Sequence, residues 1–76
     1  MTTKKCMDIF VYRLNRKMNI QHITQNELAI KTGISKTTMS RYLNKKRIPR
    51  IDAVIKIANV LGCSISELID VNENNH

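Results

Sequence analysis

Apolar residues recur along this chain with the spacing of an α-helix, and no segment alternates apolar and polar residues convincingly as a β-strand would. The first segment shows the spacing most clearly, with one apolar stripe formed by Met7, Phe10, Val11, Leu14 and Met18. The spacing and the boundary residues together predict five short helices, over about residues 6–19, 25–32, 36–44, 51–61 and 65–70. We therefore expect an all-α fold.

The length of the chain, 76 residues, predicts one small domain. A domain of this size buries only about 60% of the surface of its unfolded chain, which leaves no room for a deep cleft between subdomains. We expect the domain to occupy residues 1–70. Residues 71–76 have little apolar surface to bury, so we expect a frayed tail there.

Local signals mark where the helices begin and end. Two Ser/Thr-x-x-Glu capping boxes and one further N-cap serine mark three helix starts: Thr24–Glu27, Ser64–Glu67 and Ser35. Gly33 and Gly62 follow two of the periodic segments, and glycine adopts the left-handed conformation that ends many helices. The short interval around Gly33 predicts a tight turn between two helices.

The segment 51–61 is apolar around more than one side. We expect its main buried stripe to consist of Ile51, Val54, Ile55, Ala58 and Leu61. Ile57 and Val60 widen the apolar arc, which leaves two interpretations: a central helix packed on several sides, or a contact between subunits. Under the second interpretation the dimer contact would comprise Ile57, Val60, Ile65 and Ile69.

The positive charge of the chain is concentrated in one window. Thirteen Lys and Arg against six Asp and Glu give a net charge of +7 and a pI near 9.9. Seven of the basic residues lie between positions 31 and 50, where there is no acid: Lys31, Lys36, Arg41, Lys45, Lys46, Arg47 and Arg50. Basic and acidic residues balance in the rest of the chain, so this window predicts a surface that faces a polyanion.

The helix expected within this window has two distinct sides. Wound at about 100° per residue, it places Met39, Tyr42 and Leu43 together on one side. The other side carries short polar side chains between two long cations: Lys36, Thr37, Ser40, Arg41 and Asn44. A solvated helix usually includes glutamates that pair with its cations, so this side favours contact with a negatively charged partner.

The remaining residue types argue against catalysis and cofactors. Cys6 and Cys63 lie far apart among apolar neighbours, so we expect buried or half-buried thiols in a reducing compartment. His22 and His76 lack the spacing of a zinc site, and we expect no metal, no cofactor and no enzymatic activity. There is no apolar run long enough to cross a membrane and no secretory leader, so we expect a cytoplasmic protein without a membrane partner.

Several segments together resemble one known family. They are Ile23–Ala29, Thr32–Ser35, Thr38–Tyr42 with Pro49, and the stretch from Gly62 to Ile69. This combination looks like the lambda-repressor/Cro-type (XRE family) helix-turn-helix domain, with the helix-turn-helix over about residues 25–44. The resemblance implies a compact five-helix, lambda-repressor-like domain that binds DNA, usually as a dimer on a near-palindromic operator.

Carried over position by position, the resemblance also implies roles for individual residues. The positions that face DNA bases in the family are Lys36, Thr37, Ser40 and Arg41. Contacts to DNA phosphates are implied for Gln25, Ser35, Asn44, Lys45, Lys46 and Arg47.

Two positions depart from the family pattern. Many members pair an arginine on the first helix with a glutamate near the end of the third, where this chain has Met18 and Leu43. We expect a hydrophobic contact in place of that ion pair, a replacement that is often neutral or stabilising. Lys45 stands where relatives often have glycine. A left-handed conformation costs a non-glycine residue about 1–2 kcal/mol, so we expect a loop of different shape.

The sequence thus predicts a sequence-specific transcriptional regulator, a small repressor that binds double-stranded DNA as a homodimer with no small-molecule effector. The main alternative is an antitoxin or protein-interaction adaptor built on the same scaffold. RNA binding is a weaker alternative because single-strand binders need several aromatic residues for stacking, and this chain has only three.

Overall fold

A computed structural model describes residues 3–69, which form five helices and no strand. The helices are α1 (Thr3–Gln21), α2 (Gln25–Thr32), α3 (Lys36–Leu43), α4 (Ile51–Leu61) and α5 (Ile65–Leu68). The predicted all-α fold of five helices is confirmed. The predicted tail, residues 71–76, lies outside the described residues.

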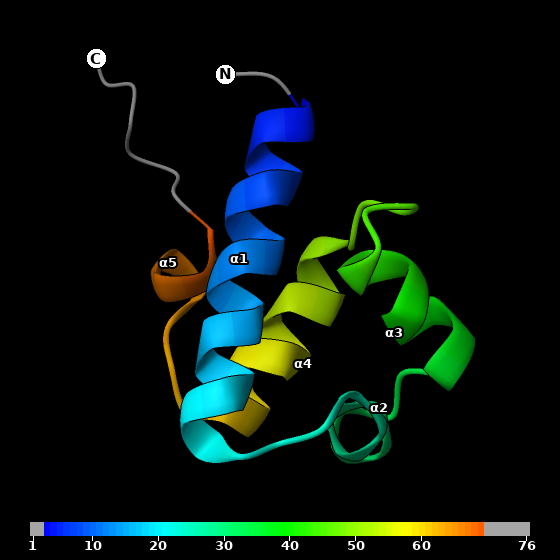
Figure 1. The fold of residues 1–76 in the computed structure, drawn as a ribbon, viewed down its shortest axis with the longest axis vertical. Helices are drawn as coiled ribbons and strands as arrows, with labels where there is room; N and C mark the ends of the chain where they lie inside the picture. The colour runs from blue at the N-terminus through cyan, green and yellow to red at the C-terminus, as the bar shows by residue number, and fades with distance from the viewer. Residues whose placement is uncertain (1–2, 70–76) are drawn as a thin grey trace.

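α1 is the long helix around which the others are arranged (Figure 1). Its predicted stripe, from Met7 to Met18, is buried at all five positions. The helix extends beyond the predicted range at both ends, and its end is closed by a left-handed His22 (φ 57°). The N–H of Ile23 then donates to the Met18 carbonyl at 2.9 Å, which satisfies a carbonyl that the helix itself leaves without a partner.

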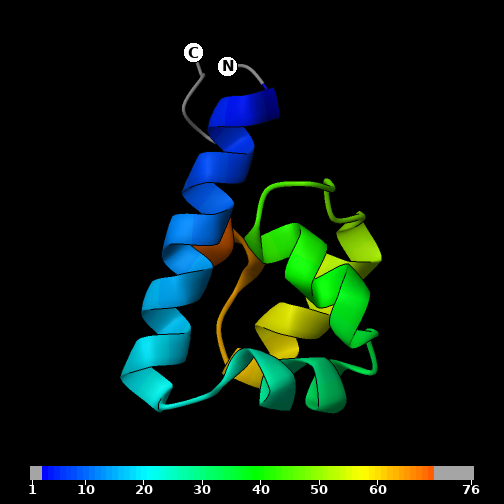
Figure 2. The same cartoon turned by 45° about the vertical axis from the view of Figure 1, so that its right-hand side comes forward.

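The hydrophobic core joins all five helices. Its most deeply buried large side chains include at least one from each helix: Phe10, Leu14, Leu28, Met39, Ile57 and Leu68. α2 packs against α3 and α4, while α5 packs against α1 and α4. In Figure 1, α5 and α3 lie on opposite sides of α1, and Figure 2 shows α2 and α3 together in front of α4. The helix-turn-helix is therefore supported from behind by α4.

The buried side of α4 agrees with the sequence prediction in part, since Val54, Ala58 and Leu61 of the expected stripe are buried. Ile51 and Ile55, expected on the buried stripe, are exposed, whereas Ile57 is completely buried. The buried side centres on Val54, Ile57 and Leu61 and includes the small Ala53 and Ala58. α4 contacts α2, α5 and α1, which favours the interpretation of a central helix packed on several sides.

Met18, Leu43 and the two cysteines differ in how deeply they are buried. Met18 is buried and Leu43 packs against the core, as expected for apolar residues at these two positions. Cys63 is half-buried as predicted, and burial raises the pKa of its thiol. The expectation for Cys6 is wrong: this side chain is exposed because it lies outside the apolar stripe of α1.

Candidate nucleic-acid interface

The start of α2 is held by the predicted capping box. The Glu27 N–H donates to Thr24 Oγ1 at 3.1 Å, and the Thr24 N–H donates to Glu27 Oε1 at 2.9 Å. The second of these bonds is the main reason that the pKa of Glu27 lies below its usual range. Gln25, the first residue of the helix, is exposed. The Gln25 side chain is therefore accessible to an anion at the start of α2.

The turn between α2 and α3 is built from Thr32 and Gly33. The buried Thr32 hydroxyl donates to the Leu28 carbonyl at 2.8 Å and accepts the Ile34 N–H at 3.3 Å. Gly33 has the left-handed conformation (φ 78°), and its N–H donates to the Ala29 carbonyl at 3.0 Å. These bonds confirm the predicted tight turn and fix the direction in which α3 leaves α2.

The rotation of α3 is set by its cap and its buried side. The Thr38 N–H donates to Ser35 Oγ at 3.1 Å, and the Ser35 hydroxyl donates to Thr38 Oγ1 at 2.9 Å. On the inner side, Met39 is 0% exposed and Tyr42 is 5% exposed. Ser35, predicted to contact a phosphate, is thus the N-cap of this helix.

The predicted polar side of α3 faces outward. Lys36, Thr37 and Arg41 are exposed, and Ser40 is half-buried between them. Asn44, one turn after Ser40, is exposed, and its side-chain amide donates to the Ser40 carbonyl at 2.9 Å and to Ser40 Oγ at 3.1 Å. The division of α3 into an apolar and a polar side is confirmed, while the contacts of these residues with DNA remain a prediction.

The loop after α3 begins with a strained residue. Lys45 adopts a left-handed conformation (φ 60°), so the expectation of a differently shaped loop is wrong. The Lys46 N–H donates to the Arg41 carbonyl at 2.8 Å, and the Lys45 N–H donates to the Tyr42 carbonyl at 3.1 Å. These two bonds satisfy the last carbonyls of α3, which explains why a lysine is kept in a conformation that favours glycine.

An acidic residue that the sequence prediction did not assign to the site lies next to this loop. Asp8 of α1 forms an ion pair with Lys45, with 2.8 Å between Asp8 Oδ1 and Lys45 Nζ. Each of the two side chains is about half exposed. The pair ties the loop after α3 to the long helix. The only sequence signal was an acid on the polar side of the first helix, and nothing local connects that acid with Lys45.

The rest of the loop presents cations to solvent. Lys46, Arg47 and Arg50 are all exposed. Lys36 and Arg41 of α3 are exposed as well, so the cations of this window are open to a negatively charged partner.

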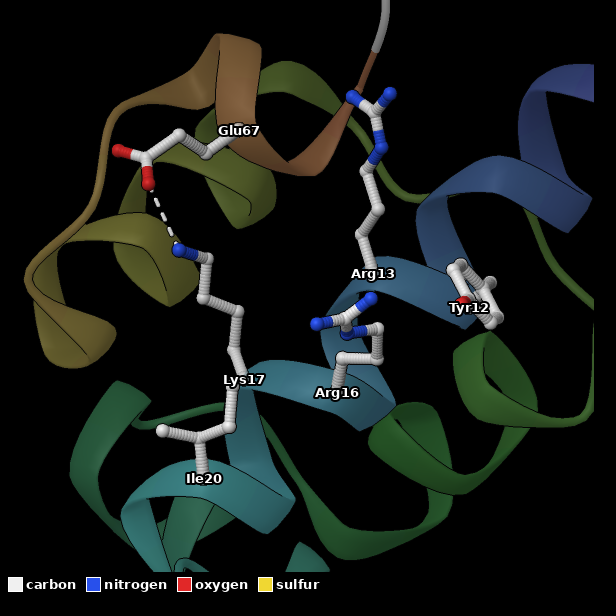
Figure 3. Close-up of a pocket in the computed structure, with 6 residues that line it drawn as sticks. All are labelled: Tyr12, Arg13, Arg16, Lys17, Ile20 and Glu67. Atoms are coloured by element: carbon white, nitrogen blue, oxygen red, sulfur yellow. Dashed lines mark hydrogen bonds and ion pairs between the residues drawn. The ribbon is translucent and has the colours of Figure 1, made fainter.

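A second group of cations lies on α1, next to α5, and lines a shallow hollow (Figure 3). Lys17 forms an ion pair with Glu67 at 2.7 Å, and Arg13 donates to the Ser66 carbonyl at 3.3 Å. Arg16 lies over the Tyr12 ring, 6.0 Å from its centre. The contacts of Lys17 and Arg13 hold α5 against α1, on the side away from α3, whereas the contact of Arg16 with Tyr12 lies within α1.

The residues predicted for a dimer contact do not form an exposed surface. Ile57 is completely buried in the core, so this part of the prediction is wrong. Val60, Ile65 and Ile69 are partly buried and pack against the same core. Their apolar surface is used mainly within the domain.

Within residues 3–69, neither a metal-binding cluster nor a membrane-spanning helix is present. No group of three or more His, Cys, Asp and Glu side chains in this range is arranged to hold a metal ion. No helix in this range is both long enough and apolar enough to cross a membrane.

Residues 13–74 match the Cro/C1-type HTH (helix-turn-helix) DNA-binding domain. A segment of 46 residues is 44% identical to part of the replication factor C small subunit of Methanocaldococcus jannaschii. That segment is 60% of this chain but only 2% of the archaeal protein. No solved structure matches the chain significantly.

Proposed function

We propose that this chain, which belongs to the Cro/C1-type HTH DNA-binding domain family, is a sequence-specific transcriptional regulator that acts as a small repressor. Its partner is double-stranded DNA. α3 lies in the major groove, which is about 12 Å wide and admits a helix. Occupation of an operator excludes other proteins from the same DNA, so repression requires binding alone and no catalytic step.

The orientation of α3 supports this proposal more than any other observation. Lys36, Thr37 and Arg41 point outward without a neighbouring acid in sequence, while Met39 and Tyr42 anchor the helix from behind. A helix with this division can approach DNA without exposing part of the core.

Each outward residue of α3 has a definite role in the proposed complex. The Arg41 guanidinium and the Lys36 ammonium are suited to the O6 and N7 acceptors of guanine. Thr37 and Ser40 have hydroxyls that both donate and accept, and the Thr37 methyl can contact a thymine methyl. These four residues read the bases.

A second set of residues holds the phosphates and fixes the position of α3 along the duplex. This set comprises Gln25, Ser35, Asn44, Lys45, Lys46 and Arg47. Gln25 acts together with the N–H groups at the start of α2. The lysines and Arg47 act mainly through charge, so affinity falls steeply with salt concentration.

The operator proposed here is near-palindromic and is bound by a homodimer. One eight-residue helix offers few base contacts, and two copies with half-sites about 34–36 Å apart double them. We place the protein in the cytoplasm, where its own concentration and dimerisation, rather than a small-molecule effector, control operator occupancy.

Selection of bound sites from a random pool of DNA duplexes tests this function. The wild-type chain is expected to enrich one two-fold symmetric motif. Arg41→Ala is expected to relax the preference at one position of each half-site, at a cost of about 1–3 kcal/mol. Lys46→Ala is the matched control, since loss of a phosphate contact weakens all sequences by a similar factor.

Two results would contradict the proposal. If Arg41→Ala leaves the relative affinities of operator variants unchanged, the assignment of base contacts is wrong. If no motif is enriched and the chain instead co-purifies with a protein partner, the antitoxin or adaptor alternative is favoured. The activity of the archaeal replication factor subunit is not proposed for this chain, because the similarity covers 2% of that protein.

A further inference from the structure

We propose that the chain pairs with a second copy of itself through the α4 face, an apolar surface formed by Ile48, Ile51 and Ile55. This inference deepens the proposed homodimer by naming its contact surface. The inference rests on the proposed function, which supplies the reason for a dimer, but the experiments that test the dimer need no DNA.

The α4 face consists of large apolar side chains left outside the core. Ile48, Ile51 and Ile55 are 58%, 61% and 40% exposed. Ile51 and Ile55 lie one turn apart on the same side of α4, and Ile48 precedes them by three residues in the adjoining loop. Several exposed isoleucines within eight residues mark an interaction surface better than scattered single ones do. Ile51 and Ile55 remain exposed because α4 turns its other side, with Ala53 and Ile57, towards the core.

The charges beside the α4 face fit a second copy of the same surface. Arg50 and Asp52 lie next to Ile51, are strongly exposed, and are joined only by a long contact of 4.0 Å between Nε and Oδ1. In a two-fold interface, residue i of one subunit contacts residue j of the other, and the reverse contact also forms. Arg50 of each copy therefore meets Asp52 of the partner. DNA is a poorer occupant, because isoleucines offer no hydrogen bond to phosphate and Asp52 repels it.

The position of the α4 face also suits a pair. Figures 1 and 2 place the first turn of α4 on the side of the molecule that carries α3. The loop that joins the two elements carries Lys46 and Arg47. Pairing at this face brings two basic loops together and leaves both α3 helices available to one duplex.

Light scattering during size-exclusion chromatography, over a range of protein concentrations, tests the pairing. The wild-type chain is expected to form a dimer as its concentration rises. Ile51→Lys is expected to weaken dimerisation roughly tenfold or more, since it removes apolar contact and adds like charges across the axis. The matched control is Ile20→Lys, the same substitution at an equally exposed isoleucine of α1. Both side chains are exposed, and circular dichroism verifies that both variants fold.

Charge exchange supplies a second test. Arg50→Asp and Asp52→Arg each place like charges across the axis, so each variant alone is expected to be a monomer. A mixture of the two restores both opposite-charge contacts and is expected to form the mixed dimer. Destabilisation of the fold would not be repaired by mixing.

Three outcomes overturn the inference: a wild-type chain that is monomeric at all concentrations, an Ile20→Lys variant that dissociates as readily as Ile51→Lys, or a mixture that stays monomeric. The DNA selection separates this inference from the proposed function. If the α4-face variants dissociate as expected but the wild-type chain enriches no DNA motif, the proposed regulator is refuted and the pairing is supported. A monomer that enriches a motif does the reverse.

Discussion

Within residues 3–69, two residues other than glycine hold left-handed backbone conformations, and each follows the end of a helix. His22 ends α1 and Lys45 follows α3, with φ values of 57° and 60°. Gly62 has the same conformation after α4, at φ 68°. The Cβ atom of a non-glycine residue makes this conformation costly by about 1–2 kcal/mol. The local hydrogen bonds to the helix carbonyls compensate for that strain.

His22→Gly is expected to raise the free energy of unfolding by about 0.5–1 kcal/mol. The substitution removes the strain, and part of the gain is offset because glycine makes the unfolded chain more flexible. His22 is exposed, so little packing is lost. Urea unfolding followed by circular dichroism measures the change.

Two controls accompany this prediction. His22→Ala keeps the Cβ atom and is expected to show no such gain. Gly62→Ala should lower the free energy of unfolding by about 1 kcal/mol. No atom lies within 4 Å of an added Cβ there, so the loss would come from the backbone alone. Equal stabilities of the glycine and alanine variants at position 22 would contradict the strain explanation.

At the scale of single elements, the sequence predicted the features that depend on near neighbours in the chain. The capping boxes at Thr24 and Ser64 and the turn at Gly33 were all predicted correctly, since each involves only a few consecutive residues. The side that α4 buries was predicted in part: Val54, Ala58 and Leu61 are buried as expected, whereas Ile51 and Ile55 are exposed. Because this helix is apolar on more than one side, its own sequence does not decide which side the other helices cover.

The candidate site shows the same limit. The outward side of α3 follows from helical periodicity and was found, whereas the contact of Asp8 with Lys45 joins positions 37 residues apart and was not. No periodic or local pattern marks an ion pair between a helix and a loop that lies far from it in the sequence. The left-handed Lys45 likewise depends on the carbonyls that its loop must satisfy.

The ion pair between α1 and the loop after α3 leads to a prediction about DNA affinity. The Asp8 carboxylate pairs with the Lys45 ammonium, so it competes with a DNA phosphate for that positive charge. Asp8→Asn is expected to strengthen DNA binding at low salt. It should also steepen the slope of log K against log salt by about 0.9, the value for one more neutralised phosphate. Titrations of a labelled duplex at several salt concentrations measure both quantities.

Glu67→Gln is the matched control for this experiment, because it removes an equal charge from an ion pair on the α5 side of α1. If the two variants bind DNA equally well, net charge rather than release of Lys45 explains the effect.

For the whole molecule, the ion pairs that Asp8 and Lys17 form from α1 have different consequences. Asp8 joins α1 to the proposed DNA-binding loop, while Lys17 joins α1 to α5 through Glu67. α5 is only four residues long and contributes the fully buried Leu68 to the core. A helix this short is not stable alone, so its contacts with α1 and its capping box must hold it in place.

The stability of the whole domain should therefore depend on pH through Glu67. The hydrogen bond from Lys17, and next the bond from the Ser64 N–H, hold the pKa of Glu67 at about 2. An unfolded glutamate has a pKa of about 4.3, so the unfolded chain binds the proton more readily. The stabilisation is complete above that value and is lost as pH falls through about 2. We expect the melting temperature to fall across this acidic window.

Two substitutions on opposite sides of the pair test this dependence. Glu67→Gln removes the titrating group, and Lys17→Met removes the ammonium that lowers its pKa. Both are expected to lower stability at neutral pH and to flatten the acidic part of the curve of melting temperature against pH. Glu27 also has a lowered pKa, so each variant should retain part of the dependence of melting temperature on pH. That dependence should diminish in Glu27→Gln. A Lys17→Met variant with the full wild-type slope would show that the contact between α1 and α5 does not cause the pH dependence.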